Sequence, residues 1–228
     1  MAGQIALVGG DEFRQGCEIM DSYLLEITGP RASSVLIVPT AALDGPARAA
    51  SNGVRHFSRL GAKASELMVL DGRDANDEAL VGKISQATHV YFTGGDPNHL
   101  LNTLKGSLLL QRLQDWNAEG GILVGSSAGA MVMGSSMRRP REGLWTDGLG
   151  LTEGLAVLPH NERSDPASVA ETLEESAPRG IKVLGIDART CCVGSPGDWK
   201  VVGVGKVTGY WNGQWQSFSS GETLPSEF

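Results

Sequence analysis

The stretch GILVGSSAGAMVM, residues 121–133, decides the fold. Its first half is short and aliphatic, as expected for a buried strand, and its second half is small and apolar, as in a helix packed closely on a sheet. Between them, residues 125–129 fit G-x-S-x-G, the pattern of a sharp strand-to-helix turn that exposes a serine hydroxyl at a sheet edge. The pattern predicts Ser127 as a nucleophile, and a glycine-rich turn without chemistry is the alternative.

The rest of the chain alternates short apolar runs with helical patterns, which predicts a parallel sheet covered on both faces. The glycine-punctuated runs after Gly180 favour antiparallel strands, and Ser135–Gly150 is the one candidate for a long irregular loop. We predict one domain over residues 1–228, of the α/β class, with a mainly parallel sheet flanked by helices and antiparallel C-terminal strands. The expected strands are Ile5–Gly9, Val35–Pro39, Glu66–Leu70, His89–Gly95 and Gly121–Ser127, and the expected helices are Gly45–Leu60 and Leu100–Asn117.

Composition narrows the classes of function. The formal net charge of -7 over 228 residues argues against nucleic-acid binding, which needs a basic face. The N-terminal sequence lacks a signal-peptide core, and no apolar run approaches the length of a membrane span. The three cysteines lack disulfide and metal-ligand spacing. We therefore expect a soluble cytoplasmic protein with no cofactor, no metal, no nucleic-acid partner and no membrane partner; a homodimer is left open.

A second glycine loop supports a catalytic site. The run HVYFTGGD, residues 89–96, places two glycines directly after a strand, where backbone N–H groups can turn toward an anion. If this strand neighbours the one before Ser127, the N–H groups of Gly95 and Ala128 would together hold an oxyanion. Ordinary helix capping by Asp96, with Pro97 starting the helix, is the alternative and is compatible with the first reading.

Four histidines are candidates for the base. His56 follows an arginine in a polar helix and is expected to be solvated, and His89 opens a strand and is expected to be structural. His99 lies in the first turn after the glycine loop and rivals His160, which ends the apolar run LAVLP at the edge of a strand. Position alone gives His160 even odds.

Several motifs in this order resemble the peptidase E and cyanophycinase family of serine peptidases, which is related in fold to class I glutamine amidotransferases. They are GSSAGAMVM after a strand, YFTGGD before a helix, LPH after GLGL, and GIDARTCCV near the end. The resemblance spans most of the chain and implies Ser127 as nucleophile, His160 as base, and oxyanion donors at Gly95 and Ala128. It also implies an acid in the loop after the nucleophile helix, where Glu142 is favoured over Asp147.

Specificity is less firmly implied. Pro97 stands where cyanophycinase-like sequences tend to have Gln, and the downstream arginine of peptidase E has only Arg163 to match it. Arg163 and Arg138, the latter clustered with Arg139 and Arg141, are the expected ligands of a substrate carboxylate; a solvated basic loop is equally consistent.

The expected function is hydrolysis of short peptides, with an aspartyl residue at the scissile bond, through an acyl-enzyme on Ser127. The alternatives are a cyanophycinase-like hydrolase of β-aspartyl peptides, an esterase of the α/β-hydrolase fold, and a non-catalytic binding or regulatory domain. The esterase fold is disfavoured because its histidine comes much later in the chain than His160, after which no histidine remains.

Overall fold

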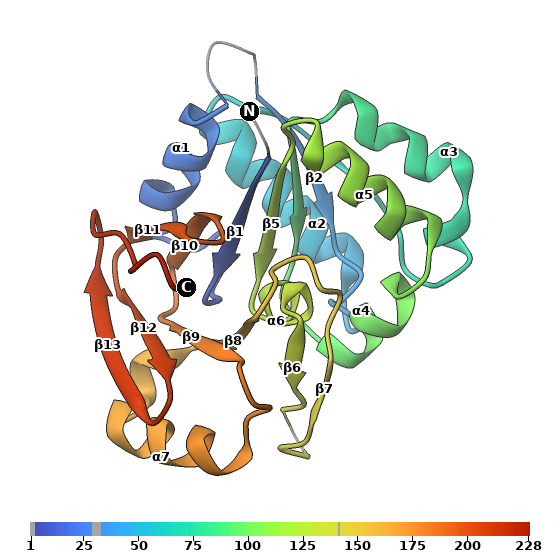
Figure 1. Ribbon diagram of the computed structural model, residues 1–228. Coiled ribbons are helices and arrows are strands. Elements are labelled where there is room, and N and C mark those ends of the chain that lie inside the picture. Colours follow the sequence, from blue (N-terminus) through green and yellow to red (C-terminus); the bar gives the residue numbers. More distant parts are fainter. Residues whose placement is uncertain (1–2, 29–32, 141) are drawn as a thin grey trace.

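The computed structural model describes residues 3–28, 33–140 and 142–228 (Figure 1). The strands are β1 Gln4–Val8, β2 Ser34–Val38, β3 Lys63–Glu66, β4 His89–Phe92, β5 Ile122–Ser126, β6 Ser136–Arg138, β7 Trp145–Asp147, β8 Leu155–Pro159, β9 Lys182–Ile186, β10 Thr190–Ser195, β11 Asp198–Gly203, β12 Lys206–Trp211 and β13 Gln214–Ser219. The α-helices are α1 Glu18–Glu26, α2 Pro46–Arg59, α3 Glu78–Val81, α4 Pro97–Leu104, α5 Leu108–Ala118, α6 Ala128–Met133 and α7 Pro166–Ser176. Three short 3-10 helices lie at Asp74–Asn76, Gly82–Gln86 and Asn161–Arg163.

The central sheet has seven strands in the order β11-β10-β1-β5-β4-β2-β3. The five strands from β1 to β3 in this order are parallel, and β10 and β11 add an antiparallel edge. Because β4 and β5 are direct neighbours, the loops that follow them leave the same carboxyl edge side by side. This confirms the predicted mainly parallel α/β fold and the arrangement on which the oxyanion hypothesis depends.

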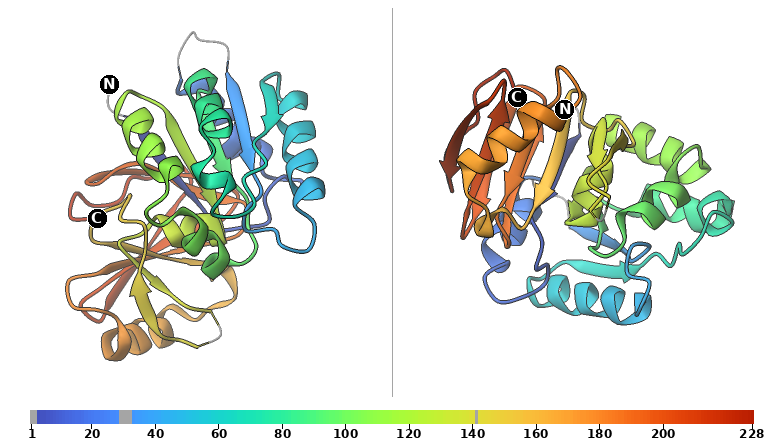
Figure 2. Two further views of the ribbon diagram at one scale, coloured as in Figure 1. Left: turned by 90° about the vertical axis from the view of Figure 1, so that its right-hand side faces the viewer. Right: turned by 90° about the horizontal axis from the view of Figure 1, so that it is seen from below.

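A four-stranded sheet, β13-β12-β9-β8, lies beside the central one, and α7 packs against its β12 and β13 (Figures 1 and 2). Its strand β8 runs parallel to β9, whereas β12 and β13 form an antiparallel hairpin. The strands β10 to β13 pair antiparallel as predicted, and they are divided between the two sheets. The end of β8 therefore approaches the central sheet from outside it.

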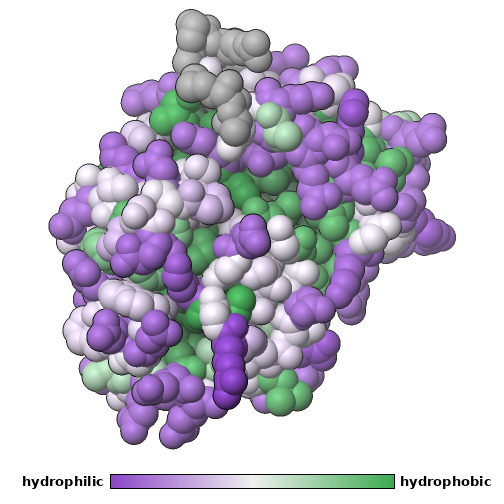
Figure 3. Space-filling model, in the orientation of Figure 1, coloured by the Kyte–Doolittle hydropathy of each residue, from purple (hydrophilic) through white to green (hydrophobic). Residues whose placement is uncertain are grey.

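Alternation along the parallel strands fills two hydrophobic layers. Ile5 and Leu7 face the layer that contains α4, α5 and α6, while Ala6 and Val8 face the layer that contains α1 and α2. Both faces of the sheet are thus covered by helices. On the surface view of Figure 3, hydrophilic residues dominate the rim, and hydrophobic residues show mainly nearer the middle. None of the helices that the structure describes combines the length and the hydropathy of a membrane span.

Three local predictions were wrong. The helix predicted over Leu100–Asn117 is divided into α4 and α5, because Gly106 adopts a φ of 73° and Ser107 caps the second helix by accepting from the N–H of Leu110. The run Glu66–Leu70 is not a strand beyond Glu66, although Leu67 and Val69 are fully buried. The predicted irregular loop Ser135–Gly150 contains the hairpin β6–β7.

Candidate active site

Ser127 occupies a strained turn between β5 and α6. Its φ of 49° and ψ of -108° lie outside the regions that a serine ordinarily adopts, and such conformations cost about 1–3 kcal/mol. The turn is held by its N–H, which donates to the carbonyl oxygen of Val8 at 2.9 Å. The sequence GSSAGA thus forms the elbow that the G-x-S-x-G pattern predicts.

The two glycines of that pattern are required by close packing. A Cβ atom at Gly125 would lie 2.5 Å from the carbonyl carbon of Gly129, and one at Gly129 would lie 2.7 Å from the carbonyl oxygen of Phe92. Any side chain there would push α6 away from β5 and β4. The glycines therefore allow the helix to start directly over the sheet edge, where Ser127 is exposed to a cavity.

The loop after β4 lies against the nucleophile. A Cβ atom at Gly94 would come 3.3 Å from the Cβ atom of Ser127. Gly95, with a φ of 143°, follows, and the carbonyl oxygen of Ala41 occupies the place where its side chain would be. Among the described residues, the N–H groups of Gly95 and Ala128 donate to no protein acceptor. These two donors are available to an oxyanion formed on the substrate of Ser127.

His160 enters the same cavity from the end of β8. It has a left-handed backbone with a φ of 55° and a ψ of 40°, and its N–H donates to the carbonyl oxygen of Gly9 at 2.9 Å. A Cβ atom at Gly10 would lie 2.4 Å from the imidazole Cε1, so only glycine lets the ring lie this close to the backbone. Ser127 and His160 line one cavity, as the base hypothesis requires.

The carboxylate beside His160 is that of Glu162. Its Oε1 lies 4.0 Å from the imidazole Nδ1, and its Oε2 accepts a hydrogen bond of 2.9 Å from the N–H of Ala188. Partial burial alone would raise the pKa of Glu162, but the hydrogen bonds from backbone N–H groups and the nearby His160 and Arg163 lower it on balance. Glu162 is therefore held as a carboxylate, as the acid of a triad must be.

The structure does not bring Glu142 to His160. Glu142 is half exposed and pairs with Arg139 at 3.3 Å, on the hairpin that lines a neighbouring groove. Asp147 is 87% exposed and lies 4.0 Å from Lys105. Because β6–β7 carries both carboxylates away from the end of β8, Glu162 replaces Glu142 as the candidate acid. The His-x-Glu spacing at residues 160–162 is the sequence signal that could have indicated it.

Glu12 connects the glycine loop after β4 with the elbow after β5, and the sequence analysis did not identify it. One carboxylate oxygen accepts from the N–H of Gly94 at 2.7 Å, and the other accepts from the hydroxyl of Ser126 at 2.7 Å. The residues on either side, Asp11 and Phe13, have positive φ values of 58° and 64°. This strained loop after β1 thus fixes the glycine loop against the elbow, and its position after a strand of the parallel region was the available signal.

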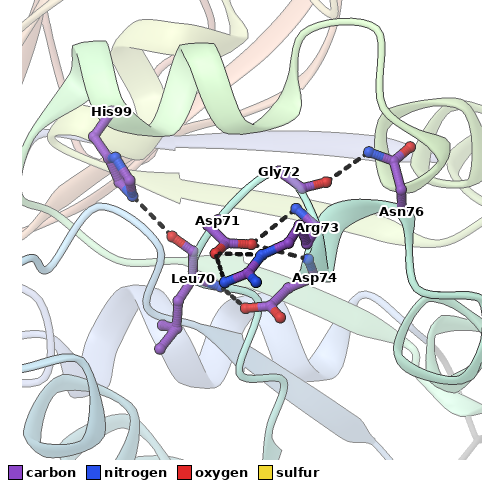
Figure 4. Close-up of polar contacts among 7 residues, drawn as sticks. All are labelled: Leu70, Asp71, Gly72, Arg73, Asp74, Asn76 and His99. Atoms are coloured by element: carbon purple, nitrogen blue, oxygen red, sulfur yellow. Dashed lines mark hydrogen bonds and ion pairs between the residues drawn. The ribbon is translucent and has the colours of Figure 1, made fainter.

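The other histidines are held in structural contacts. The Nε2 of His99 lies 2.9 Å from the carbonyl oxygen of Leu70 and supports the turn at residues 71–76 (Figure 4), which removes His99 as a rival base. His89 lies 2.8 Å from the carbonyl oxygen of Leu24, so its structural role is confirmed. The expectation for His56 was wrong, because it is buried and pairs with buried Asp21 at 2.8 Å. Burial raises the pKa of Asp21, and the hydrogen bond with His56 opposes that shift.

The predicted carboxylate ligands do not line the cavity of Ser127. Arg163 is 87% exposed and lies 3.7 Å from Glu162, and Arg138 packs beside Gly143 in the hairpin. Arg141 lies outside the described residues. The cavity has a volume of about 580 Å³, within the range of small-molecule sites. One wall of the cavity is formed by α2, with residues Ala49, Asn52, Arg55, His56 and Arg59.

In the described part of the chain, no three His, Cys, Asp or Glu side chains lie together in a way that could hold a metal ion. Cys17, Cys191 and Cys192 are buried and unbridged. Burial raises the pKa of Cys17 to about 12 and that of Cys192 further, which leaves both as unreactive thiols.

A strained serine, an imidazole and free backbone donors at the edge of a parallel sheet define a serine hydrolase of the α/β class. The model of Peptidase family S51 matches residues 5–193, and the chain belongs to this family of serine peptidases.

Relatives agree with this assignment. The chain is 27% identical over 227 residues to cyanophycinases of Synechococcus elongatus and Thermosynechococcus vestitus, covering 90% of this chain and 67% of each relative. A crystal structure of a peptidase from an acI-B1 actinobacterium superposes with a TM-score of 0.84 at 31% identity, over 99% of this chain and 97% of that one. A putative peptidase E from Listeria monocytogenes EGD-e shares the fold, with a TM-score of 0.63 at 16% identity over 90% of this chain and 100% of that one.

Proposed function

We propose that this serine peptidase hydrolyses short peptides through an acyl-enzyme on Ser127. The observation that carries the proposal is the convergence of Ser127, His160 and the glycine loop on one cavity of about 580 Å³. A cavity of this size encloses a few residues of peptide rather than a folded protein.

The proposed reaction has two halves. His160 takes the proton of Ser127 as the hydroxyl oxygen attacks the peptide carbonyl, and the Gly95 and Ala128 N–H groups stabilise the resulting oxyanion. His160 then gives the proton to the leaving amine, and water hydrolyses the acyl-enzyme by the same steps. Glu162 holds the imidazole and stabilises its cationic form. The long 4.0 Å contact is consistent with this role, because catalytic contacts often tighten only in the complex with substrate.

The proposed substrates carry an aspartyl residue at the scissile bond, as the resemblance to peptidase E implies. The similarity to cyanophycinases favours hydrolysis of β-aspartyl peptides as a second candidate. We further propose a cytoplasmic protein that acts without a cofactor, nucleic acid or membrane, either as a monomer or as a homodimer. The three unbridged cysteines are consistent with a reducing compartment.

Purified protein tests the proposal with Asp-Leu, Asn-Leu, Ala-Leu and β-Asp-Leu as substrates. We expect hydrolysis of Asp-Leu to exceed that of Asn-Leu at least tenfold in kcat/KM, which corresponds to about 1.4 kcal/mol. The reason is that a carboxylate can form a bidentate, charge-assisted pair with a guanidinium, whereas a neutral amide cannot. Faster hydrolysis of β-Asp-Leu would favour the cyanophycinase-like alternative. Absence of any Ser127-dependent hydrolysis would refute the proposal.

A further inference from the structure

The acidic side chains that line the active-site cavity have partners within the protein, whereas two of its arginines have no ion-pair partner among the described residues. Its two acidic side chains, Asp11 and Glu12, are both engaged: Asp11 lies 3.7 Å from Arg14, and Glu12 accepts from Gly94 and Ser126. By contrast, no carboxylate of the described residues lies within ion-pair distance of Arg55 or Arg59. The lining therefore carries three arginines against two carboxylates, a net charge of +1, and Arg55 and Arg59 are its arginines without an ion-pair partner among the described residues.

The two unmatched arginines lie on one face of α2. They are four residues apart, so their side chains are neighbours on the helix surface, and both border the cavity that holds Ser127. Two like charges at this spacing are unfavourable for the helix itself. In a chain with 26 acidic and 19 basic residues, this placement costs stability and satisfies no carboxylate of the protein.

Arg55 is also partly preorganised. Its Nη1 donates to the hydroxyl of Ser51 at 2.9 Å, and its Nη2 donates to the side-chain oxygen of Asn52. A guanidinium has five N–H donors, so these two bonds fix its plane and leave donors for a ligand. An arginine fork held in this way suits the planar, two-oxygen geometry of a carboxylate.

We propose that Arg55 and Arg59 form a carboxylate subsite on the α2 wall of the active-site cavity. This inference rests on the proposed function only for the source of the carboxylate, which is either an acidic side chain of the peptide or its C-terminus. It assigns acidic recognition to α2 in place of Arg138 and Arg163, neither of which borders the cavity.

The experiment measures binding without turnover. The full chain carrying Ser127→Ala is titrated calorimetrically with Asp-Leu, Asn-Leu and Asp-Leu amide. The same titrations are made with the protein that carries Arg55→Gln and Arg59→Gln in addition to Ser127→Ala. Loss of affinity with Asn-Leu identifies a side-chain carboxylate, and loss with the amide identifies the C-terminus. Arg112→Gln, an exposed arginine of α5 that borders a different hollow, is the matched control.

We expect the peptide that retains the recognised carboxylate to bind at least tenfold more tightly than its neutral analogue. The double variant should abolish that ratio, while Arg112→Gln should leave it within twofold. An unchanged ratio in the double variant, no preference for either carboxylate, or no measurable binding of any of the three peptides would overturn the subsite. The single variants Arg55→Gln and Arg59→Gln give the same readout if the double variant unfolds.

Failure of the two proposals is distinguishable. If the parent protein hydrolyses none of the peptides while the Ser127→Ala variant binds them in a manner that depends on Arg55 and Arg59, the proposed function fails and the subsite stands. If hydrolysis depends on Ser127 but carboxylate preference is independent of α2, the subsite fails and the proposed function stands.

Discussion

The two sides of the active-site cavity are built in different ways. On the nucleophile side, Ser127 and Gly95 follow adjacent parallel strands of one sheet, so local chain geometry and strand order place them together. On the base side, His160 and Glu162 follow β8 of the second sheet. Contacts with Gly9 and Gly10 place His160 at the cavity, and the N–H of Ala188 holds Glu162 beside it. The nucleophile side is therefore determined by short sequence motifs, whereas the base side depends on tertiary contacts between the two sheets.

The largest expected effect falls on the nucleophile side. Ser127→Ala removes the attacking oxygen and should lower kcat on the order of 10⁶-fold, as loss of the nucleophile does in other triads. Ser126→Ala is the matched control and should stay within about tenfold, because its hydroxyl donates to Glu12 and is not the attacking group. Steady-state kinetics on a dipeptide measures both, and equal losses would contradict the elbow assignment.

The base side should respond next most strongly. Glu162→Gln keeps the shape of the side chain but removes its charge, and should lower kcat by about a hundredfold to ten-thousandfold with little change in KM. Glu142→Gln should stay near the parent activity, since Glu142 pairs with Arg139 on the hairpin. If Glu142→Gln proves the more damaging variant, the hairpin rather than β8 supplies the acid.

Glu12 tests how firmly the nucleophile side must be held. Glu12→Ala leaves the Gly94 N–H and the Ser126 hydroxyl without their acceptor, and loss of hydrogen bonds to a charged group costs about 1.5–3 kcal/mol. We expect kcat to fall about tenfold to a hundredfold while KM changes little. Glu12→Gln should retain more activity, because its amide oxygen can still accept from Gly94. A change confined to KM would show that Glu12 contacts substrate instead.

The smallest expected effect is on stability. The pKa of Glu162 is lowered in the folded protein, so its contribution is present above its unfolded value of about 4.3 and is lost as the pH falls through the folded value. The difference in Tm between the parent and Glu162→Gln should therefore be constant from pH 8 to 5 and shrink below about pH 4. Thermal melts across this range measure it, and a difference that grows on acidification would contradict the sign.

The nucleophile side could be predicted from the sequence better than the base side. The elbow at Ser127 and the glycine loop at Gly95 could be read from sequence, because glycine requirements and strand endings are local properties. The acid could not be placed by loop position, since the β6–β7 hairpin directs Glu142 elsewhere. His56 was misjudged for a similar reason: its polar neighbours suggest exposure, but the tertiary contact with Asp21 buries it.

Covalent labelling tests the central claim most directly. The parent protein and the variants Ser127→Ala, His160→Ala and Arg112→Gln are treated with a fluorophosphonate, digested, and mapped by mass spectrometry. The arrangement of Ser127 with His160 predicts one adduct, on Ser127, that is absent from Ser127→Ala, strongly slowed in His160→Ala and unchanged in Arg112→Gln. An adduct on Ser126, or labelling of Ser127 at an equal rate without His160, would contradict it.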